Sequence, residues 1–272
     1  MLTDIFIGGM AGIISRSTTA PIELYKIQCQ NQYLKHANIR AVIKKEGIRY
    51  LWKGNLTNCM RVFPQFAAQY TTFENSKQHL FHNIKTPIIQ NFLSGGVAGM
   101  VSMISMYPLE TIRTRISLQM NKSHYSGPIN ALRTLKIREL YRGLGISILG
   151  FAPFSALNFT SYYYIKNWLE HWQSLFQLDN SSNITKLIAG GTSGIVSLSV
   201  TYPTDLLRRH FQMAGFNNSV PQYNGILDGF KCIVRKDGFR GLYRGLSASY
   251  IRIFPCLAIQ FWCLDKGAEL FH

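Results

Sequence analysis

The chain has 272 residues, of which 47% are hydrophobic and 15% are charged, and its mean hydropathy is +0.02. The charged fraction lies below the roughly 25% of soluble domains, and the net charge of +16 suits an anionic partner. The basic residues are dispersed and frame no nucleic-acid-binding motif, which excludes nucleic acid as the expected partner. Five cysteines without a C-x-x-C pair and seven dispersed histidines predict neither a disulfide framework nor a metal site.

Charged residues are missing from long parts of the chain. A helix of about 20 residues crosses a bilayer, and three segments close to that length carry no charge: 91–109, 143–165 and 187–204. Two further apolar segments each contain one base, Arg16 within Ile5–Ala20 and Arg61 within Gly54–Phe73. An ionisable residue at membrane depth usually faces a hydrated interior, so both arginines are candidate functional residues. The alternative interpretation is a soluble, basic, all-helical binding protein with apolar core helices.

Two glycine–proline patterns each occur three times. The segments GGMAG, GGVAG and GGTSG are each followed, nine positions after the last glycine, by a proline: Pro21, Pro108 and Pro203. The segments WKGN, YRGL and YRGL contain Gly54, Gly143 and Gly245, and a proline follows each of these glycines by ten positions: Pro64, Pro153 and Pro255. Matched spacing of this kind predicts three units with the same fold, at residues 1–84, 85–177 and 178–272.

Each unit is predicted to contain a helix with a proline, a short helix, and a second helix with a proline. The expected fold is an all-α membrane protein with six transmembrane helices around a central cavity. The paired glycines let helices approach closely in lipid, and the prolines bend the helices. An even number of spans places both termini on one side, and parallel repeats place a binding site near the midplane.

An acid and a base follow the first proline of each unit, at the second and fifth positions. The pairs are Glu23 with Lys26, Glu110 with Arg113, and Asp205 with Arg208. Residues three apart share one helix face, so one interpretation is three local surface pairs of little energetic value. The other is a closed ring, in which each acid reaches the base of a neighbouring unit and the ring seals one end of the cavity.

These motifs resemble those of the mitochondrial carrier family. The pattern P-x-[DE]-x-x-[KR] occurs three times, and an acid–glycine pair followed by an aromatic, a base and a glycine lies downstream, complete at 46–54 and 237–245 and partial at 141–143. The resemblance implies a matrix gate made of the pairs Glu23–Arg113, Glu110–Arg208 and Asp205–Lys26. It also implies that Gln30 and Gln212 brace this gate, whereas Ser117 occupies the third bracing position.

A second gate, on the cytoplasmic side, is implied by the family pattern [FY]-[DE]-x-x-[KR]. Glu74 and Lys77 match it in the first unit. The second unit has Lys166 but no acid, and the third has Asp265 but no base at the expected place. We therefore expect a weak cytoplasmic gate with at most two ion pairs.

The family's substrate contacts lie three positions before each proline of the second helices. The resemblance carries them to Arg61, Gly150 with Phe151, and Arg252, and it adds Arg16. Any one of these arginines could instead extend to a lipid headgroup. Three in one cavity would need a counter-charge, which a polyphosphate supplies in a geometry that suits the guanidinium fork. Gly150 is expected to leave room for a flat base, on which Phe151 could stack.

The predicted function is exchange of nucleotides such as ADP and ATP across the mitochondrial inner membrane by alternating access, closest to the nucleotide and coenzyme A carriers. Coenzyme A or thiamine pyrophosphate remain alternative cargoes, and a non-transporting adaptor derived from a carrier is an alternative of another class. No constellation of catalytic residues predicts an enzyme, and no cofactor is expected. The resemblance also implies a monomer, both termini in the intermembrane space, and cardiolipin bound at Lys53–Gly54, Arg142–Gly143 and Arg244–Gly245.

Overall fold

The computed structural model describes residues 2–30, 43–44, 46–84, 86–119, 125–175, 182–214 and 223–271, and every element in these ranges is helical. Five elements have 26 to 32 residues: α1 (Leu2–Gln30), α5 (Pro87–Leu118), α8 (Leu144–Leu175), α9 (Ser182–Met213) and α11 (Leu246–Phe271). A sixth long segment is divided into α3 (Asn55–Met60), α4 (Val62–Asn75) and the π-helix η2 (Ser76–Leu80). The short elements are η1 (Ile48–Trp52), α6 (Pro128–Thr134), α7 (Ile137–Leu140) and α10 (Ile226–Gly241).

The division of the sixth segment falls at Arg61, three residues before Pro64. Proline has no N–H, so the carbonyl of Met60 loses the hydrogen bond that would continue the helix. Pro153 and Pro255 lie at the corresponding places inside α8 and α11, which continue unbroken. The second helix of the first unit therefore differs from the expected single span by a one-residue interruption.

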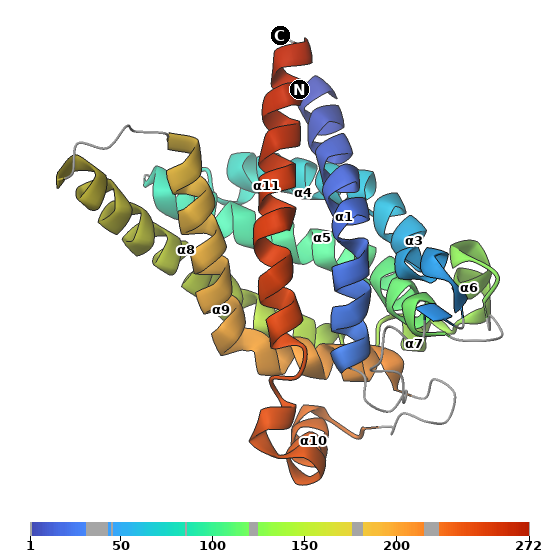
Figure 1. The fold of residues 1–272 in the computed structure, drawn as a ribbon. Helices are drawn as coiled ribbons and strands as arrows, with labels where there is room; N and C mark the ends of the chain where they lie inside the picture. The colour runs from blue at the N-terminus through green and yellow to red at the C-terminus, as the bar shows by residue number, and fades with distance from the viewer. Residues whose placement is uncertain are drawn as a thin grey trace.

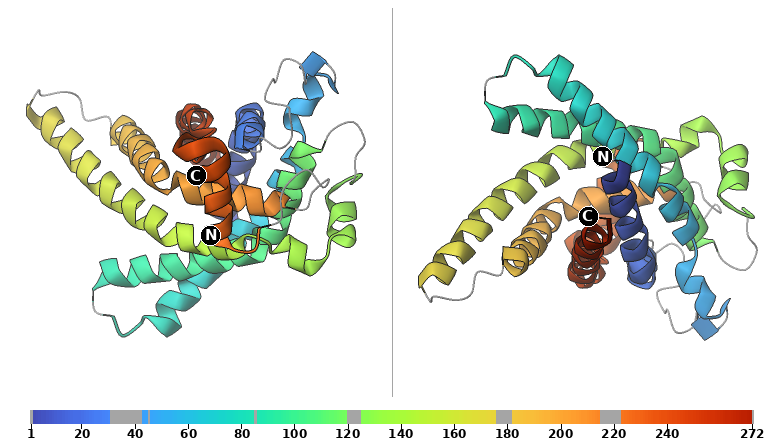
Figure 2. Two further views of the ribbon diagram at one scale, coloured as in Figure 1. Left: turned by 90° about the horizontal axis from the view of Figure 1, so that it is seen from below. Right: turned by 90° about the horizontal axis from the view of Figure 1, so that it is seen from above.

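The long helices form three two-helix arms, each of which joins two different units. α4 packs along α5, α8 along α9, and α11 along α1, whereas the two long helices of one unit contact each other much less. Figure 2 shows the three arms spreading from a common centre. Both termini lie at the end where the arms diverge, and α10 lies at the opposite end (Figure 1).

The buried apolar core lies at the end remote from the termini. One cluster gathers Ile27, Ile112 and Met213 from the lower ends of α1, α5 and α9, and a second gathers Leu206, Leu207 and Ile233 from α9 and α10. These contacts hold α1, α5 and α9 together where they converge. The diverging halves of the arms contribute no comparable cluster among the described residues, so the space between them is available for a cavity.

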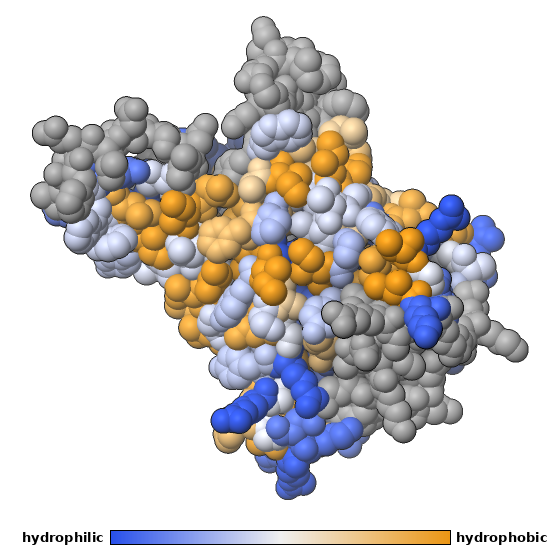
Figure 3. Space-filling view, in the orientation of Figure 1, coloured by the Kyte–Doolittle hydropathy of each residue, from blue (hydrophilic) through white to orange (hydrophobic). Residues whose placement is uncertain are grey.

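The outer surface is apolar around the arms. Two helical stretches, 89–118 and 137–173, are long and apolar enough to cross a membrane, and only 22% and 17% of their most apolar windows are buried. A core helix of a soluble protein would be mostly buried, so this low burial favours contact with lipid. Figure 3 shows apolar side chains over the middle of the molecule and hydrophilic ones at the lower end, around α10.

A glycine turn starts the second helix of each unit. Gly54, Gly143 and Gly245 have φ values of 83°, 88° and 83°, a left-handed conformation that other residues adopt only with strain. In two units, the tyrosine that precedes the proline of the first helix holds this turn in place. Tyr107 donates to the Arg142 carbonyl at 3.2 Å, and Tyr202 donates to the Arg244 carbonyl at 2.6 Å. These bonds fix where α8 and α11 begin relative to the kinked helices.

The basic residue of two of these turns caps the next unit. Lys53 Nζ donates to the carbonyl of Gln119 at 2.8 Å, and Arg142 Nη1 donates to the carbonyl of Ala214 at 3.2 Å. These carbonyls end α5 and α9, where cationic side chains are favoured by the helix dipole. The two side chains therefore connect successive units at the end remote from the termini.

Candidate functional site

Three ion pairs close the space between α1, α5 and α9. Lys26 Nζ lies 2.8 Å from Asp205 Oδ2, Arg113 Nη2 lies 2.5 Å from Glu23 Oε2, and Arg208 Nη2 contacts Glu110 Oε2. Each pair joins two units, and each has the partners that the family resemblance implies. The interpretation of these charges as three local surface pairs is wrong, because acids and bases from different helices meet in the interior.

Two aromatic rings support the bases of this ion-pair ring. Lys26 Nζ lies 5.8 Å from the centroid of Tyr202, and the Arg208 guanidinium lies 5.5 Å from that of Tyr107. Each tyrosine directly precedes the proline in the first helix of its unit, and its hydroxyl donates the hydrogen bond that holds the glycine turn. A cation over an aromatic face gains electrostatic attraction in a desolvated site, so the tyrosines link the ring to the turns behind it.

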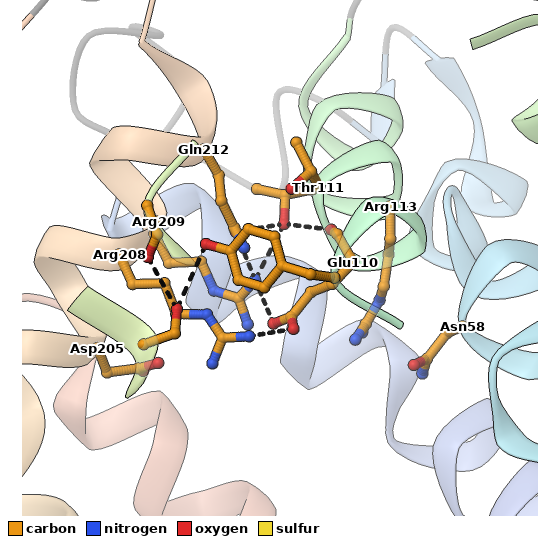
Figure 4. A network of polar contacts seen from close by, with 12 residues as sticks. Asn58, Glu110, Thr111, Arg113, Asp205, Arg208, Arg209 and Gln212 are labelled. Atoms are coloured by element: carbon orange, nitrogen blue, oxygen red, sulfur yellow. Dashed lines mark hydrogen bonds and ion pairs between the residues drawn. The ribbon is translucent and has the colours of Figure 1, made fainter. Parts of the chain in front are cut away.

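Glu110 is the most heavily used acid of the ring. Besides Arg208, it contacts Arg61 Nη1 at 3.3 Å through Oε2 and Arg209 Nη1 at 3.3 Å through Oε1. Figure 4 shows Arg208 and Arg209 reaching toward this carboxylate from α9. The sequence interpretation missed Arg209, which is only 7% exposed. The available signal was the doubled base Arg208–Arg209, where the other two motifs have a single base.

The two glutamines brace the ring in different ways. Gln30 Nε2 donates to Asp205 Oδ2 at 3.3 Å and to the Tyr202 hydroxyl at 3.1 Å, so it holds one ion pair directly. Gln212 Oε1 accepts from Arg209 Nη1 at 3.0 Å and from Thr114 Oγ1 at 3.0 Å. Gln212 therefore holds Arg209, whereas the family pattern led us to expect that it would hold the Arg208 pair.

The three cavity arginines have unequal environments. Arg61 contacts Glu110, and Arg252 Nη1 lies 3.8 Å from Glu23 Oε2. The expectation that these arginines lack protein counter-charges is thus wrong for two of them, because the ring acids lie directly beneath them. Arg16 differs, since Nη1 approaches the Asn58 side-chain oxygen at 3.4 Å and, among the described residues, no carboxylate within 4.0 Å.

A cavity of about 480 Å³ lies above the ring and collects the predicted contact residues. Seven bases and three acids line it, which leaves four positive charges in excess. The predicted contacts in this lining are Arg16, Arg61, Gly150, Phe151 and Arg252, and the ring residues form its floor. A hollow with this balance of charge attracts multiply charged anions.

Gly150 has a packing role in addition to its expected place at the cavity. A Cβ built on Gly150 would lie 2.8 Å from Thr204 Oγ1, so the glycine lets α8 approach α9. Gly150 also lines the cavity, so its expected place beside the cargo stays a prediction. The Phe151 ring lies against Gly99 of α5 and also lines the cavity.

The charges at the open end of the molecule do not meet across the arms. Lys166 Nζ pairs with Glu170 Oε1 on its own helix at 3.5 Å, and Lys77 Nζ lies 5.9 Å from the Phe73 ring centroid. Glu74 is partly buried in α4, and the side chain of Asp265 lies outside the described side chains. No ion pair between arms is present at this end among the side chains that the structure describes, because the arms diverge there.

The chain shares its unit pattern with known proteins. The profile of the family described as mitochondrial carrier protein matches residues 1–84, 85–172 and 179–272. The mitochondrial adenine nucleotide transporter of Arabidopsis thaliana is 32% identical over 295 residues, which cover 95% of this chain and 84% of the relative. Solute carrier family 25 member 16 of Homo sapiens is 32% identical over 297 residues, with 100% and 89% covered.

The name of a third relative specifies another cargo. Mitochondrial thiamine pyrophosphate carrier 1 of Coccidioides immitis is 30% identical over 296 residues, which cover 97% of this chain and 91% of the relative. The family consists of helical membrane transporters, and this sets aside the soluble alternative. Through three matching units along nearly its whole length, the chain belongs to the mitochondrial carrier family.

Proposed function

We propose that the protein exchanges nucleotides, or closely related phosphate-bearing anions, across the mitochondrial inner membrane by alternating access. The observation that carries this proposal is the excess of four positive charges in the cavity above the ion-pair ring. A nucleoside di- or triphosphate carries a comparable negative charge. Guanidinium groups bind phosphate oxygens in pairs, so a polyphosphate matches both the charge and the chemistry of this lining.

The ring and the cavity share residues, which suggests how binding is coupled to opening. Arg61 and Arg252 contact Glu110 and Glu23 of the ring while they line the cavity. Cargo phosphates compete with these carboxylates for the two arginines and so weaken the ring. A ligand shifts a conformational equilibrium only by its differential affinity for the two states. An empty cavity leaves the ring closed, and this favours exchange over leak.

The orientation in the membrane follows from the same assignment. The six long helical segments act as spans, with both termini in the intermembrane space and the ion-pair ring facing the matrix. The basic α10 then lies at the matrix surface (Figure 3). One chain encloses the cavity, so the transporting unit is a monomer.

Lipid phosphate binds at the glycine turns in this proposal, as the family resemblance implies for cardiolipin. The side chains of Lys53 and Arg142 already donate to helix-terminal carbonyls. The N-termini of α8 and α11, which begin after Gly143 and Gly245, offer backbone N–H groups instead. The headgroup is therefore expected to contact backbone more than side chains.

Exchange in proteoliposomes tests the proposed function. The panel contains ribonucleotides, deoxynucleotides, coenzyme A and thiamine pyrophosphate, each against internal ADP and against an empty interior. Arg252→Gln should abolish exchange because it removes a cavity base. Arg235→Gln, on the exposed surface of α10, is the matched control and should retain it. Failure of every cargo to exchange with the wild type would contradict transport and support the adaptor alternative.

A further inference from the structure

A second hollow lies beside the cationic cavity. It measures about 610 Å³ and lies between α4, α5 and α8. We call it the side bay and define it by the residues that line it outside the cationic cavity, chiefly Gln65, Gln69, Asn91, Gly96, Ala152 and Asn158. The two spaces share Arg61, Phe151 and Phe154 in their walls. The two hollows are therefore direct neighbours.

The side bay lies where the second unit lacks a phenyl ring that the other two units have. The Phe63 ring lies against Gly9 in the first unit, and the Phe254 ring lies against Gly191 in the third. Each of these phenylalanines directly precedes the proline in the second helix of its unit. In the second unit that position is Ala152.

The glycine opposite Ala152 is correspondingly uncovered. A Cβ built on Gly96, the counterpart of Gly9 and Gly191, would meet no atom within 4 Å. A methyl group thus stands where the other units place a ring. The space between α5 and α8 stays open beside the cavity.

The polar groups that line the side bay are uncharged away from its shared floor. Four carboxamides contribute, those of Gln65, Gln69, Asn91 and Asn158. The Gln65 Oε1 and Asn158 Oδ1 atoms are buried and accept no hydrogen bond from the described residues. A buried acceptor without a donor is costly, so these two atoms call for a ligand that carries N–H or O–H groups.

Aromatic rings and thioethers complete the walls. Phe92 and Phe159 pack edge to face across α5 and α8, with centroids 6.2 Å apart, and Phe151 and Phe154 lie nearer the cationic cavity. Flat or amide-bearing groups gain from such surfaces. Glu110 is the one carboxylate in this lining, and three arginines already contact it. A cationic ring therefore finds no free counter-charge there.

We propose that the side bay binds the uncharged, hydrogen-bonding part of the cargo while the cationic cavity binds its phosphates. Gln65 and Asn158 select that part by donating to it and accepting from it. The shared chemistry fits a nucleobase or an amide chain such as that of coenzyme A, and it disfavours the thiazolium of thiamine pyrophosphate. This inference rests on the proposed function, because it needs a phosphate-bearing cargo.

The variant Ala152→Phe tests the side bay by restoring the ring that the other units contain. Its matched control is Ala156→Phe, on the same helix at an exposed position that lines neither hollow. Ligand-induced thermal stabilisation of the purified full chain reports binding to the folded state. The probes are ADP, coenzyme A, thiamine pyrophosphate and inorganic tripolyphosphate, of which the last needs only the cationic cavity.

We expect Ala152→Phe to weaken the binding of either ADP or coenzyme A, whichever stabilises the wild type more, by about tenfold or more, or 1.4 kcal/mol. Tripolyphosphate should bind the variant and the control equally. Gln65→Leu and Asn158→Leu should weaken the binding of the same preferred ligand and reduce the ratio of its affinity to that of tripolyphosphate. The ratio of uptake rates for the preferred cargo and thiamine pyrophosphate should fall in parallel in proteoliposomes.

Two results would overturn the inference separately from the proposed function. If Ala152→Phe left the ratio of the affinity for the preferred ligand to the affinity for tripolyphosphate unchanged, the side bay would not be a binding subsite. A wild-type preference for thiamine pyrophosphate would likewise contradict it, although transport itself would stand. If the wild type bound neither tripolyphosphate nor any nucleotide, the proposed function would fail first.

Discussion

The two ends of the helical arms carry charged motifs of the same kind and use them differently. At the closed end, acids and bases from three helices meet in the interior, and Glu110 alone contacts three arginines. At the open end, Lys166 pairs with Glu170 on its own helix, and 37% of the Lys166 side chain and 52% of the Glu170 side chain are exposed. The described contacts that hold this conformation together are therefore concentrated at one end, and changes at the two ends should differ in effect.

The largest effect is expected for Glu110→Gln. Removing this carboxylate leaves one buried and two partly buried guanidinium groups without their acid, and breaking a buried ion pair typically costs about 3–5 kcal/mol. Denaturant or thermal unfolding in detergent should show this loss, together with loss of exchange. Glu170→Gln, which breaks the pair at the open end, is the control. Equal stability of the two variants would contradict the difference between the ends.

A smaller loss of stability is expected for Lys26→Ala. Gln30 and the nearby ring bases still surround Asp205, so the loss should be roughly 1–3 kcal/mol. Exchange should fall at least tenfold while membrane insertion is retained, because one interface of the ring no longer closes. The double change Lys26→Asp with Asp205→Lys should recover part of the activity. Normal exchange in Lys26→Ala would count against the ring as a gate.

The brace at Gln30 should matter less than the charges. Gln30→Ala removes hydrogen bonds to Asp205 and Tyr202, worth about 1 kcal/mol in stability. Its expected kinetic effect is a few-fold change in exchange rate, read from initial uptake rates. Gln78→Ala, at an exposed position in η2, serves as the control. A loss of exchange rate as large as that of Lys26→Ala would mean that the ring cannot close without Gln30.

The smallest effect is expected at the open end. Lys166→Gln breaks a partly exposed pair on one helix, and such i,i+4 pairs typically contribute less than about 0.5 kcal/mol. Unfolding measured at low and high salt should show that even this difference disappears as charges are screened. A loss of several kcal/mol would show that Lys166 has a partner in another arm and would remove the contrast between the ends.

A closed ring could be predicted because it needs only repetition and spacing, which let each acid reach a base of a neighbouring unit. The choice of neighbour, such as Arg113 for Glu23, came from the resemblance to the family. The contacts of Arg61 and Arg252 with the ring acids depend on the exact tilt of the helices, which no spacing rule supplies. The role of Gly150 was missed for the same reason, since only the approach of α8 to Thr204 reveals it.

The side bay was missed for a different reason. Its cause is visible in the sequence when the three units are aligned on their second prolines, because Phe63 and Phe254 then stand beside Ala152. Motif reading looks for residues that are present, whereas this hollow arises from bulk that is missing. Position-by-position comparison of units would find it, although the size of the hollow comes only from the packed structure.

The cross-unit arms constrain how such a molecule can assemble. One arm joins α11 to α1, so α11, which is made after the other five long segments, must return to α1. Solenoid proteins grow by stacking, and each added repeat finds its neighbour at once. Here a nascent chain with one or two units still has an unpartnered first helix, and circular closure waits for the whole polypeptide.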